Sequence, residues 1–126
     1  MINLRGKTIL VTGSSKGIGK QMCSTFAELG ATVISHVRTT DAQHIDFINN
    51  LDARDGQRHT VWECELSDIP CLKSKLLKLA KNHDIDGLVN NAGVTHNAVF
   101  AMTRLEDLKK QFDTNTISPF QITQII

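Results

Sequence analysis

The sequence predicts an α/β fold built on a doubly wound parallel sheet. Short runs of β-branched and other apolar residues alternate along the 126 residues with longer segments whose apolar residues recur at helical spacing. This alternation is typical of βαβ units, whose right-handed crossovers place helices on both faces of a parallel sheet. A turn with three glycines joins the first run to the first helical segment. We therefore expect about four strands and four helices in one domain, residues 1–126.

The first half of the chain contains two predicted strand–helix pairs. Residues 7–12 form a short apolar run ended by Gly13, as expected of a strand that is buried on both faces. In the helix that follows, Gly30 is placed to end the last turn in the left-handed conformation. Residues 32–37 predict the second strand, and Gly56 is expected to end the second helix. The apolar positions of that second helix are Ile45, Ile48 and Leu51.

The second half continues the same alternation. Residues 60–64 predict a third strand, and Pro70 suits the first turn of the helix after it. Residues 85–90 predict a fourth strand. Thr103 and Glu106 have the spacing of a capping box for a last helix. Apolar positions of that helix include Leu105, Leu108, Phe112, Phe120 and Ile125.

The composition is that of an ordinary globular protein. Hydrophobic residues make up 40% and charged residues 21%, and the formal net charge of +1 gives no reason to expect a nucleic-acid partner. No apolar run approaches the roughly 18 residues of a membrane span, and the first residues lack a signal-peptide pattern. We therefore expect a cytoplasmic protein without a membrane partner. Its three cysteines lack Cys-x-x-Cys spacing, so we expect small buried hydrophobes rather than disulfides or metal ligands.

The glycine turn is the first candidate site. Residues 12–19 read Thr-Gly-Ser-Ser-Lys-Gly-Ile-Gly between a predicted strand and a predicted helix. In this context glycines allow a tight turn, the approach of a pyrophosphate to the backbone, and close packing of helix on strand. The N–H groups at the helix start then face the phosphates. The expected cofactor-binding residues here are Gly13, Ser14, Ser15, Lys16, Gly17, Ile18 and Gly19.

A glycine turn at this place has two alternatives to dinucleotide binding. A turn of this kind can be structural only, with no ligand. A P-loop requires Gly-x-x-x-x-Gly-Lys followed by a hydroxyl residue. Around Gly19 and Lys20 the sequence has Ser14 in place of the first glycine and Gln21 in place of the hydroxyl residue, so that motif is absent.

Together with two further motifs, the turn resembles the short-chain dehydrogenase/reductase family. These motifs are Asn-Asn-Ala-Gly at residues 90–93 and Asn115, in the family's order and at similar separations. Within the family the chain most resembles the 3-oxoacyl-[acyl-carrier-protein] reductases. The resemblance implies a Rossmann-type fold, present here in part, and an oxidoreductase that reduces a small-molecule carbonyl, such as a 3-oxoacyl thioester, by hydride transfer.

The end of the second predicted strand indicates which nucleotide is preferred. A preference for NAD places a carboxylate there, on the ribose hydroxyls. This chain has Ser-His-Val-Arg at residues 35–38, so no carboxylate is available. The guanidinium of Arg38 suits a 2′-phosphate, and Lys16 is placed to reach the same group. The resemblance therefore favours NADP(H), while the alternative is that both are solvated surface charges.

The remaining cofactor contacts are implied by the resemblance alone. Relatives place an aspartate on the adenine after the third strand, where this chain has Glu65 followed by Leu66. Because glutamate is one methylene longer, Asp68 or a backbone group is an alternative. The residues after the fourth strand are assigned to the ribose and the centre of the sheet, or else form a strand-ending turn. They are Asn90, Asn91, Ala92 and Gly93.

Only one residue of the family's catalytic set has a match. Asn115 corresponds to an asparagine that holds a water of the proton relay, but the chain has no tyrosine and ends before the expected serine and Tyr-x-x-x-Lys. We therefore expect a truncated enzyme that is inactive alone. Of the five histidines, His96 lies nearest to the expected substrate mouth. The alternatives are a non-catalytic NADP(H)-binding module and an interaction fragment, the latter forming a homo-oligomer through its last helix.

Overall fold

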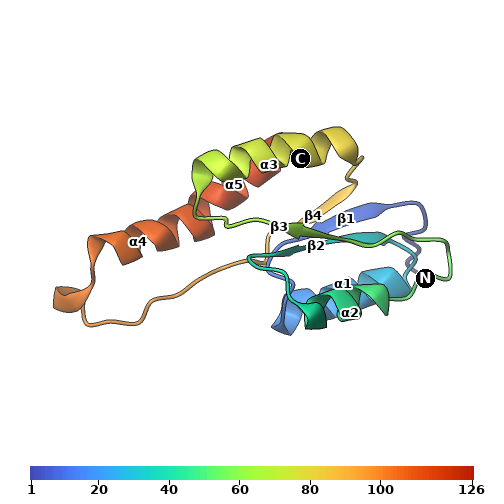
Figure 1. The fold of residues 1–126 in the computed structure, drawn as a ribbon, viewed down its shortest axis with the longest axis horizontal. Coiled ribbons are helices and arrows are strands. Elements are labelled where there is room, and N and C mark those ends of the chain that lie inside the picture. The colour runs from blue at the N-terminus through green and yellow to red at the C-terminus, as the bar shows by residue number, and fades with distance from the viewer.

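The structure is a computed structural model that describes residues 1–126, and it contains one parallel sheet covered by helices on both faces (Figure 1). The strands lie in the order β3-β2-β1-β4, and each pairs in parallel with its neighbours. Their bounds are β1 Thr8–Val11, β2 Thr32–Val37, β3 Thr60–Glu63 and β4 Gly87–Val89. The predicted doubly wound α/β fold is thus confirmed.

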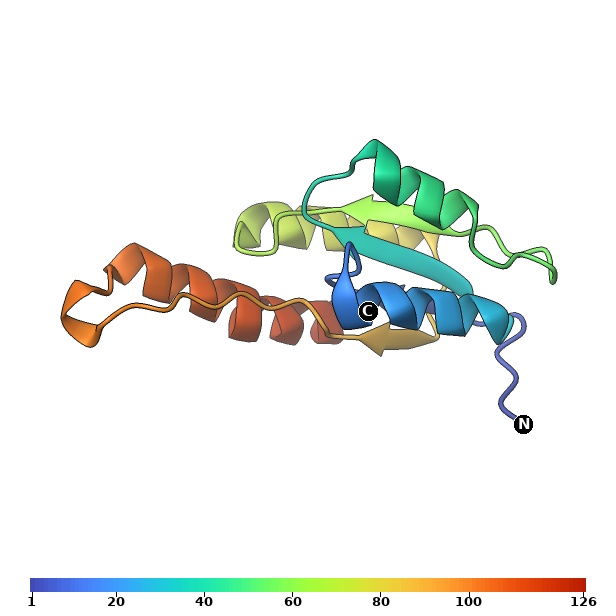
Figure 2. The same ribbon diagram turned by 90° about the horizontal axis from the view of Figure 1, so that it is seen from below.

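Five α-helices alternate with and follow the strands. Helices α1 and α2 cover one face of the sheet, and α3 and α5 cover the other (Figures 1 and 2). Their bounds are α1 Gly17–Glu28, α2 Ala42–Asn49, α3 Ile69–Asn82, α4 Leu105–Phe112 and α5 Ser118–Ile125, with a 3₁₀ turn, η1, at Phe100–Met102. None of these helices is both long enough and apolar enough to span a bilayer.

The side-chain alternation of the strands divides the core into two layers. Val11 and Val33 pack on the α1 and α2 side, whereas Leu10 and Ile34 pack on the side of α3 and α5. All four side chains are buried, as strands of a sheet covered on both faces require. The last helix closes the second layer through Ile122, which is fully buried.

The last helix is continuous but contains a wider turn. A π-helical turn, η2 (Asp113–Ile117), joins α4 to α5, and the residues at both junctions keep right-handed helical dihedrals. Helix α4 and the segment before it project beyond the sheet (Figures 1 and 2). Most apolar side chains of this projection are exposed: Val99, Phe100, Met102, Leu105, Leu108 and Phe112. Ile117 of η2 and Phe120 of α5 are exposed as well, whereas Ile122 of α5 faces the sheet.

Two sequence predictions about helix ends are wrong. Thr103 does not cap α4: its Oγ1 donates to the Val99 carbonyl at 3.2 Å, and the N-cap residue is Arg104, which makes no side-chain cap. Helix α2 ends at Asn49, well before Gly56, which instead gives the following loop a positive φ of 79°. Gly30 follows α1 with a φ of 97°, as predicted.

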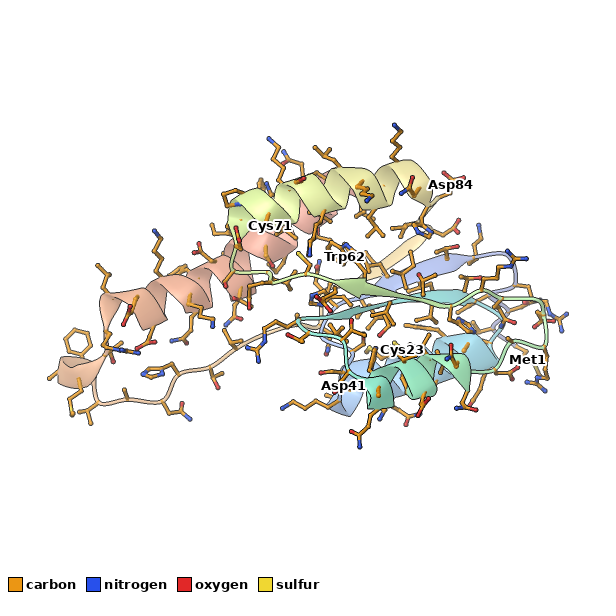
Figure 3. The ribbon with its side chains drawn as sticks, viewed as in Figure 1. Met1, Cys23, Asp41, Trp62, Cys71 and Asp84 are labelled. Carbon is orange, nitrogen blue, oxygen red and sulfur yellow. The ribbon has the colours of Figure 1, made fainter.

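The cysteines are free and mostly buried. Cys23 lies between α1 and the sheet, while Trp62 lies on the α3 side (Figure 3). Cys64 is also buried, and burial raises the pKa of its thiol to about 11. Cys71, in the first turn of α3, is only partly buried. Cys23 and Cys64 are therefore the small buried hydrophobic residues expected from the sequence, whereas Cys71 is only partly buried.

Candidate functional site

The three sequence motifs meet at the carboxyl edge of the sheet. The glycine turn leaves β1 here, and the segment that follows β4 runs beside it. Thr12 Oγ1 accepts hydrogen bonds from the backbone N–H groups of Asn91 and Ala92, both at 3.0 Å. The side-chain amide of Asn91 in turn donates to the carbonyls of Thr12 at 3.1 Å and Gly13 at 3.0 Å. Asn91 therefore fixes the turn relative to the end of β4.

Close packing explains the glycine at residue 19. A Cβ on Gly19 would lie 2.4 Å from the Gly13 carbonyl oxygen and 2.5 Å from Nδ2 of Asn91. No side chain fits there without moving α1 away from the turn. Gly17 differs, because its φ is 60° and a Cβ would meet nothing within 4 Å. Its open side is therefore free for a ligand to approach the backbone.

The amino terminus of α1 carries unpaired backbone donors. Helices α2 and α3 are capped by the carboxylates of Asp41 and Asp68. Helix α1 has no side-chain cap, its N-cap residue is Lys16, and its first turn holds no acidic residue. The N–H groups at residues 15–19 make no protein hydrogen bond. Such a helix end offers N–H donors and a partial positive charge to an anion.

Beneath the turn lies a buried polar layer. Ser14 Oγ lies 2.6 Å from Ser35 Oγ, which is hydrogen-bond distance. Ser35 Oγ in turn lies 2.8 Å from Nε2 of His44. The single Ser14 hydroxyl proton has two carbonyl acceptors within reach, those of Val11 at 3.1 Å and His36 at 3.0 Å. Ser14 is completely buried and its backbone N–H donates to the His36 carbonyl, so this residue supports the turn from below.

Beside the turn, the end of β2 presents a free cation. Arg38 is exposed and forms no ion pair, and Lys16 is exposed at the start of α1. The carboxylate of Glu65, after β3, accepts from the N–H of Ser67 at 3.1 Å and from its Oγ at 2.8 Å. Burial raises the pKa of Glu65, but these two bonds together with the charges of Lys110 and Arg38 hold the pKa below its ordinary value. One carboxylate oxygen, Oε1, thus accepts both bonds from Ser67, and the neighbouring Leu66 side chain is buried in the core.

Two asparagines connect the segment after β4 to the last helix. Asn115, in the π turn, donates from Nδ2 to the Val94 carbonyl at 2.7 Å and accepts from the Val94 N–H at 2.8 Å. Asn90 donates from Nδ2 to Thr123 Oγ1 at 3.0 Å. The structure thus places Asn115 beside the strand-end motif, bonded to the residue that follows it.

Sequence reasoning missed one residue at this site and named one that lies apart from it. The sequence pattern places His36 only at the end of a strand, yet its Nδ1 accepts the Gly13 N–H at 3.0 Å. The alternation of side chains along a strand predicts on which face of the sheet His36 lies. Its contact with the glycine turn depends on β2 being the neighbour of β1 in the sheet. His96 lies on the projecting segment, with its Nε2 3.6 Å from Asp107 Oδ2.

A glycine turn that opens a helix at the carboxyl edge of a doubly wound parallel sheet defines a Rossmann-type fold. The sequence model of the short chain dehydrogenase family matches residues 7–126. This chain belongs to that family.

Individual relatives agree with this assignment. The chain is 32% identical over 121 residues to an L-xylulose reductase of Caenorhabditis elegans, covering 95% of this chain and 46% of the relative. It is 30% identical over 127 residues to a 3-oxoacyl-[acyl-carrier-protein] reductase of Thermotoga maritima, covering 99% of this chain and 50% of the relative. The chain thus spans about half the length of the relatives it matches.

Solved structures of similar fold include complexes with NADP. A 3-oxoacyl (acyl-carrier-protein) reductase from Agrobacterium tumefaciens C58 with NADP bound superimposes with a TM-score of 0.84 at 29% identity, over 98% of this chain and 47% of that one. A short chain dehydrogenase from Burkholderia cenocepacia J2315 in complex with NADP gives a TM-score of 0.87 at 25% identity, over 98% and 50%.

Proposed function

We propose that this chain is the NADP(H)-binding part of a short-chain dehydrogenase that reduces a carbonyl, with a 3-oxoacyl thioester as the favoured substrate class. The observation that carries the proposal is the uncapped start of α1 beside the open face of Gly17. Free backbone donors, a partial positive charge and an exposed backbone are what a pyrophosphate requires. The NADP complexes of the Agrobacterium and Burkholderia relatives support this choice of ligand.

In this proposal the turn holds the pyrophosphate through its backbone. The N–H groups of residues 15–19 donate to the phosphates, while Gly13 and Ser14 shape the turn from below. Arg38 and Lys16, both exposed, meet the 2′-phosphate. No carboxylate at the end of β2 repels that group, since the residues there are His36, Val37 and Arg38.

The adenine and ribose contacts follow from the same geometry. Because Glu65 is bonded to Ser67, we propose that adenine is recognised mainly through the backbone around Glu65 and Leu66. Asn90, Ala92 and Gly93 line the cofactor's path beyond the turn, and Asn91 supports the turn itself.

The bound nicotinamide supplies the hydride, and this chain's residues orient the two reactants. The side-chain amide of Asn115 donates one hydrogen bond to Val94 and accepts one from it, and thereby fixes the segment after β4. Its second N–H and the second lone pair of Oδ1 are left to hold a water. No tyrosine is present among the 126 residues to protonate the alkoxide. We propose that the cofactor site is present here and that the proton donor is not.

The missing tyrosine and the exposed helix favour a second candidate, a non-catalytic NADP(H)-binding or interaction module. Phe100 is 95% exposed and Leu105 79% exposed on the projecting segment. Exposed apolar area of this kind favours association. In this candidate the last helix forms a homo-oligomer.

A calorimetric titration with NADPH and NADH tests the proposed function. Binding of NADPH in preference to NADH supports it, and binding of neither nucleotide by the folded chain contradicts it. Sedimentation with and without NADPH examines the second candidate, since a stable dimer without turnover supports the interaction module.

A further inference from the structure

His36 links three segments of the chain through the two nitrogens of one ring. Its Nδ1 accepts the Gly13 N–H at 3.0 Å, and its Nε2 is 2.8 Å from the Cys64 carbonyl oxygen. An N–H group can only donate and a carbonyl can only accept, so the ring is neutral with its proton on Nε2. Only 3% of the residue is exposed. His36 therefore holds the glycine turn of β1 against β2 and the end of β3.

Protonation is incompatible with this arrangement. A charged imidazolium carries a proton on both nitrogens, so its Nδ1 would face the Gly13 N–H as a second donor. The turn would lose its bond at Gly13, although the Ser14 N–H remains bonded to the His36 carbonyl at 3.0 Å. Because Gly13 begins the turn, its displacement also strains the bonds that Asn91 makes to the same backbone.

We propose that His36 is a positioning residue of the nucleotide site, and that protonation of its ring releases the glycine turn and weakens NADP(H) binding. This inference rests on the proposed function, because it concerns the affinity of the same turn. It adds a dependence on acid for which the turn itself has no histidine, since none occurs among the seven candidate residues at 13–19.

The surroundings of the ring determine where it titrates. On its own face of the sheet the ring lies against Trp62, with 5.4 Å between ring centroids, and the carboxylate of Glu65 favours the charged form. The positive charges of Lys110 and Arg38 in turn lower the pKa of Glu65 and favour its charged form.

On the opposite face lie the titratable groups Cys23 and His44, which are connected to the turn through Ser14 and Ser35. Burial is the largest influence and lowers the pKa of His36, with the Cys64 carbonyl and Glu65 opposing it in part. Release of the turn is therefore expected below the ordinary histidine range of about 6.5.

The test compares His36→Asn with His36→Leu. The Oδ1 of asparagine can accept the Gly13 N–H as Nδ1 does, but it does not titrate, whereas leucine removes the acceptor altogether. NADPH affinity is measured by calorimetry between pH 8 and the lowest pH at which circular dichroism shows a folded chain. His59→Asn is the matched control, because His59 Nδ1 accepts the Val33 N–H at 3.0 Å and its Nε2 bonds to the Asp52 carbonyl, away from the turn.

At pH 8 we expect His36→Asn to bind about as well as wild type, and His36→Leu to bind roughly fivefold more weakly, as for one lost hydrogen bond. As the pH falls, wild type and His59→Asn should lose affinity more steeply than His36→Asn. The 2′-phosphate of NADPH itself titrates near pH 6, but this contribution is common to all variants and cancels in the comparison.

Two results would overturn the role of His36. One is the same pH profile for wild type and His36→Asn, and the other is undiminished binding by His36→Leu at pH 8. Should His36→Asn not fold, the Gly13 amide resonance of wild type provides the second measurement, and a resonance that does not move through the histidine range contradicts the proposal. Absence of NADPH binding by folded wild type at pH 8 instead contradicts the proposed function.

Discussion

The side-chain amide of Asn115 forms both hydrogen bonds that a neighbouring β-strand residue would form with Val94. Nδ2 lies 2.7 Å from the Val94 carbonyl oxygen, and Oδ1 lies 2.8 Å from its backbone nitrogen. The π turn at Asp113–Ile117 presents this side chain to the segment that leaves β4. One residue of the last helix therefore sets the path of the chain beside the glycine turn.

Replacing Asn115 by alanine should release that path. Because the residue is exposed, the loss of two hydrogen bonds is expected to lower the free energy of unfolding by only about 1–2 kcal/mol. Hydrogen exchange at the Val94 amide should nevertheless accelerate strongly. Asn97→Ala, on the same exposed segment, is the control and should leave both measurements unchanged. Unaltered protection of Val94 in Asn115→Ala would refute this role.

Arg38→Asp should abolish the preference for NADPH. A lost charged hydrogen bond costs about 1.5–3 kcal/mol, which is roughly tenfold or more in affinity, and the new carboxylate also repels the 2′-phosphate. NADH affinity should change little. Calorimetry on Arg58→Asp, an exposed arginine outside the site, controls for net charge. Equal affinity of wild type for the two nucleotides would show that Arg38 is only a solvated charge.

Gly17→Val should remove nucleotide binding while the fold survives. The new side chain would occupy the open side where the pyrophosphate is expected, and the positive φ adds strain. Gly56→Val is a closely matched control, since Gly56 has a φ of 79° and equally open surroundings, but lies in a loop away from the site. Both variants should lose similar thermal stability, and only Gly56→Val should be stabilised by NADPH. If NADPH stabilises Gly17→Val as well, the turn is structural only.

Folding stability should decrease as the pH falls below about 6.5. Burial lowers the pKa of both His36 and His44, so the unfolded chain binds protons before the native chain does. The free energy of unfolding is therefore largest above the ordinary histidine pKa and declines as the pH approaches the lowered native values. Urea unfolding at several pH values measures this decline. His36→Asn should make it shallower, whereas His83→Asn, at the end of α3, should not.

The chain alone should not reduce a carbonyl at a rate typical of an enzyme. General acid catalysis contributes roughly 10²–10⁴-fold, and no tyrosine is available to supply it. Nicotinamide absorbance followed with NADPH and a 3-oxoacyl thioester measures the rate. Turnover that disappears in Gly17→Val would reveal another proton donor, and His96→Ala would then be the first variant to examine.

Local patterns were sufficient for the strands. The runs at residues 7–12 and 32–37 lie within one or two residues of β1 and β2, because a strand buried on both faces requires an apolar residue at nearly every position. Helix ends were less reliable. Thr103 has the spacing of a cap, but its hydroxyl donates to the Val99 carbonyl instead. Nothing in a four-residue pattern distinguishes a hydroxyl that accepts from the N–H of Glu106 from one that donates to a preceding carbonyl.

By itself the sequence determined the fold class, the position of the glycine turn and the cations beside it, since each depends on neighbours within one strand–helix unit. Only the tertiary structure decided that Glu65 is bonded to Ser67, that Asn91 and His36 hold the turn, and that Asn115 pairs with Val94. The Gly13–His36 contact spans 23 residues and the Asn91–Gly13 contact 78. Such contacts depend on the strand order β3-β2-β1-β4, which places residues distant in sequence at one edge of the sheet.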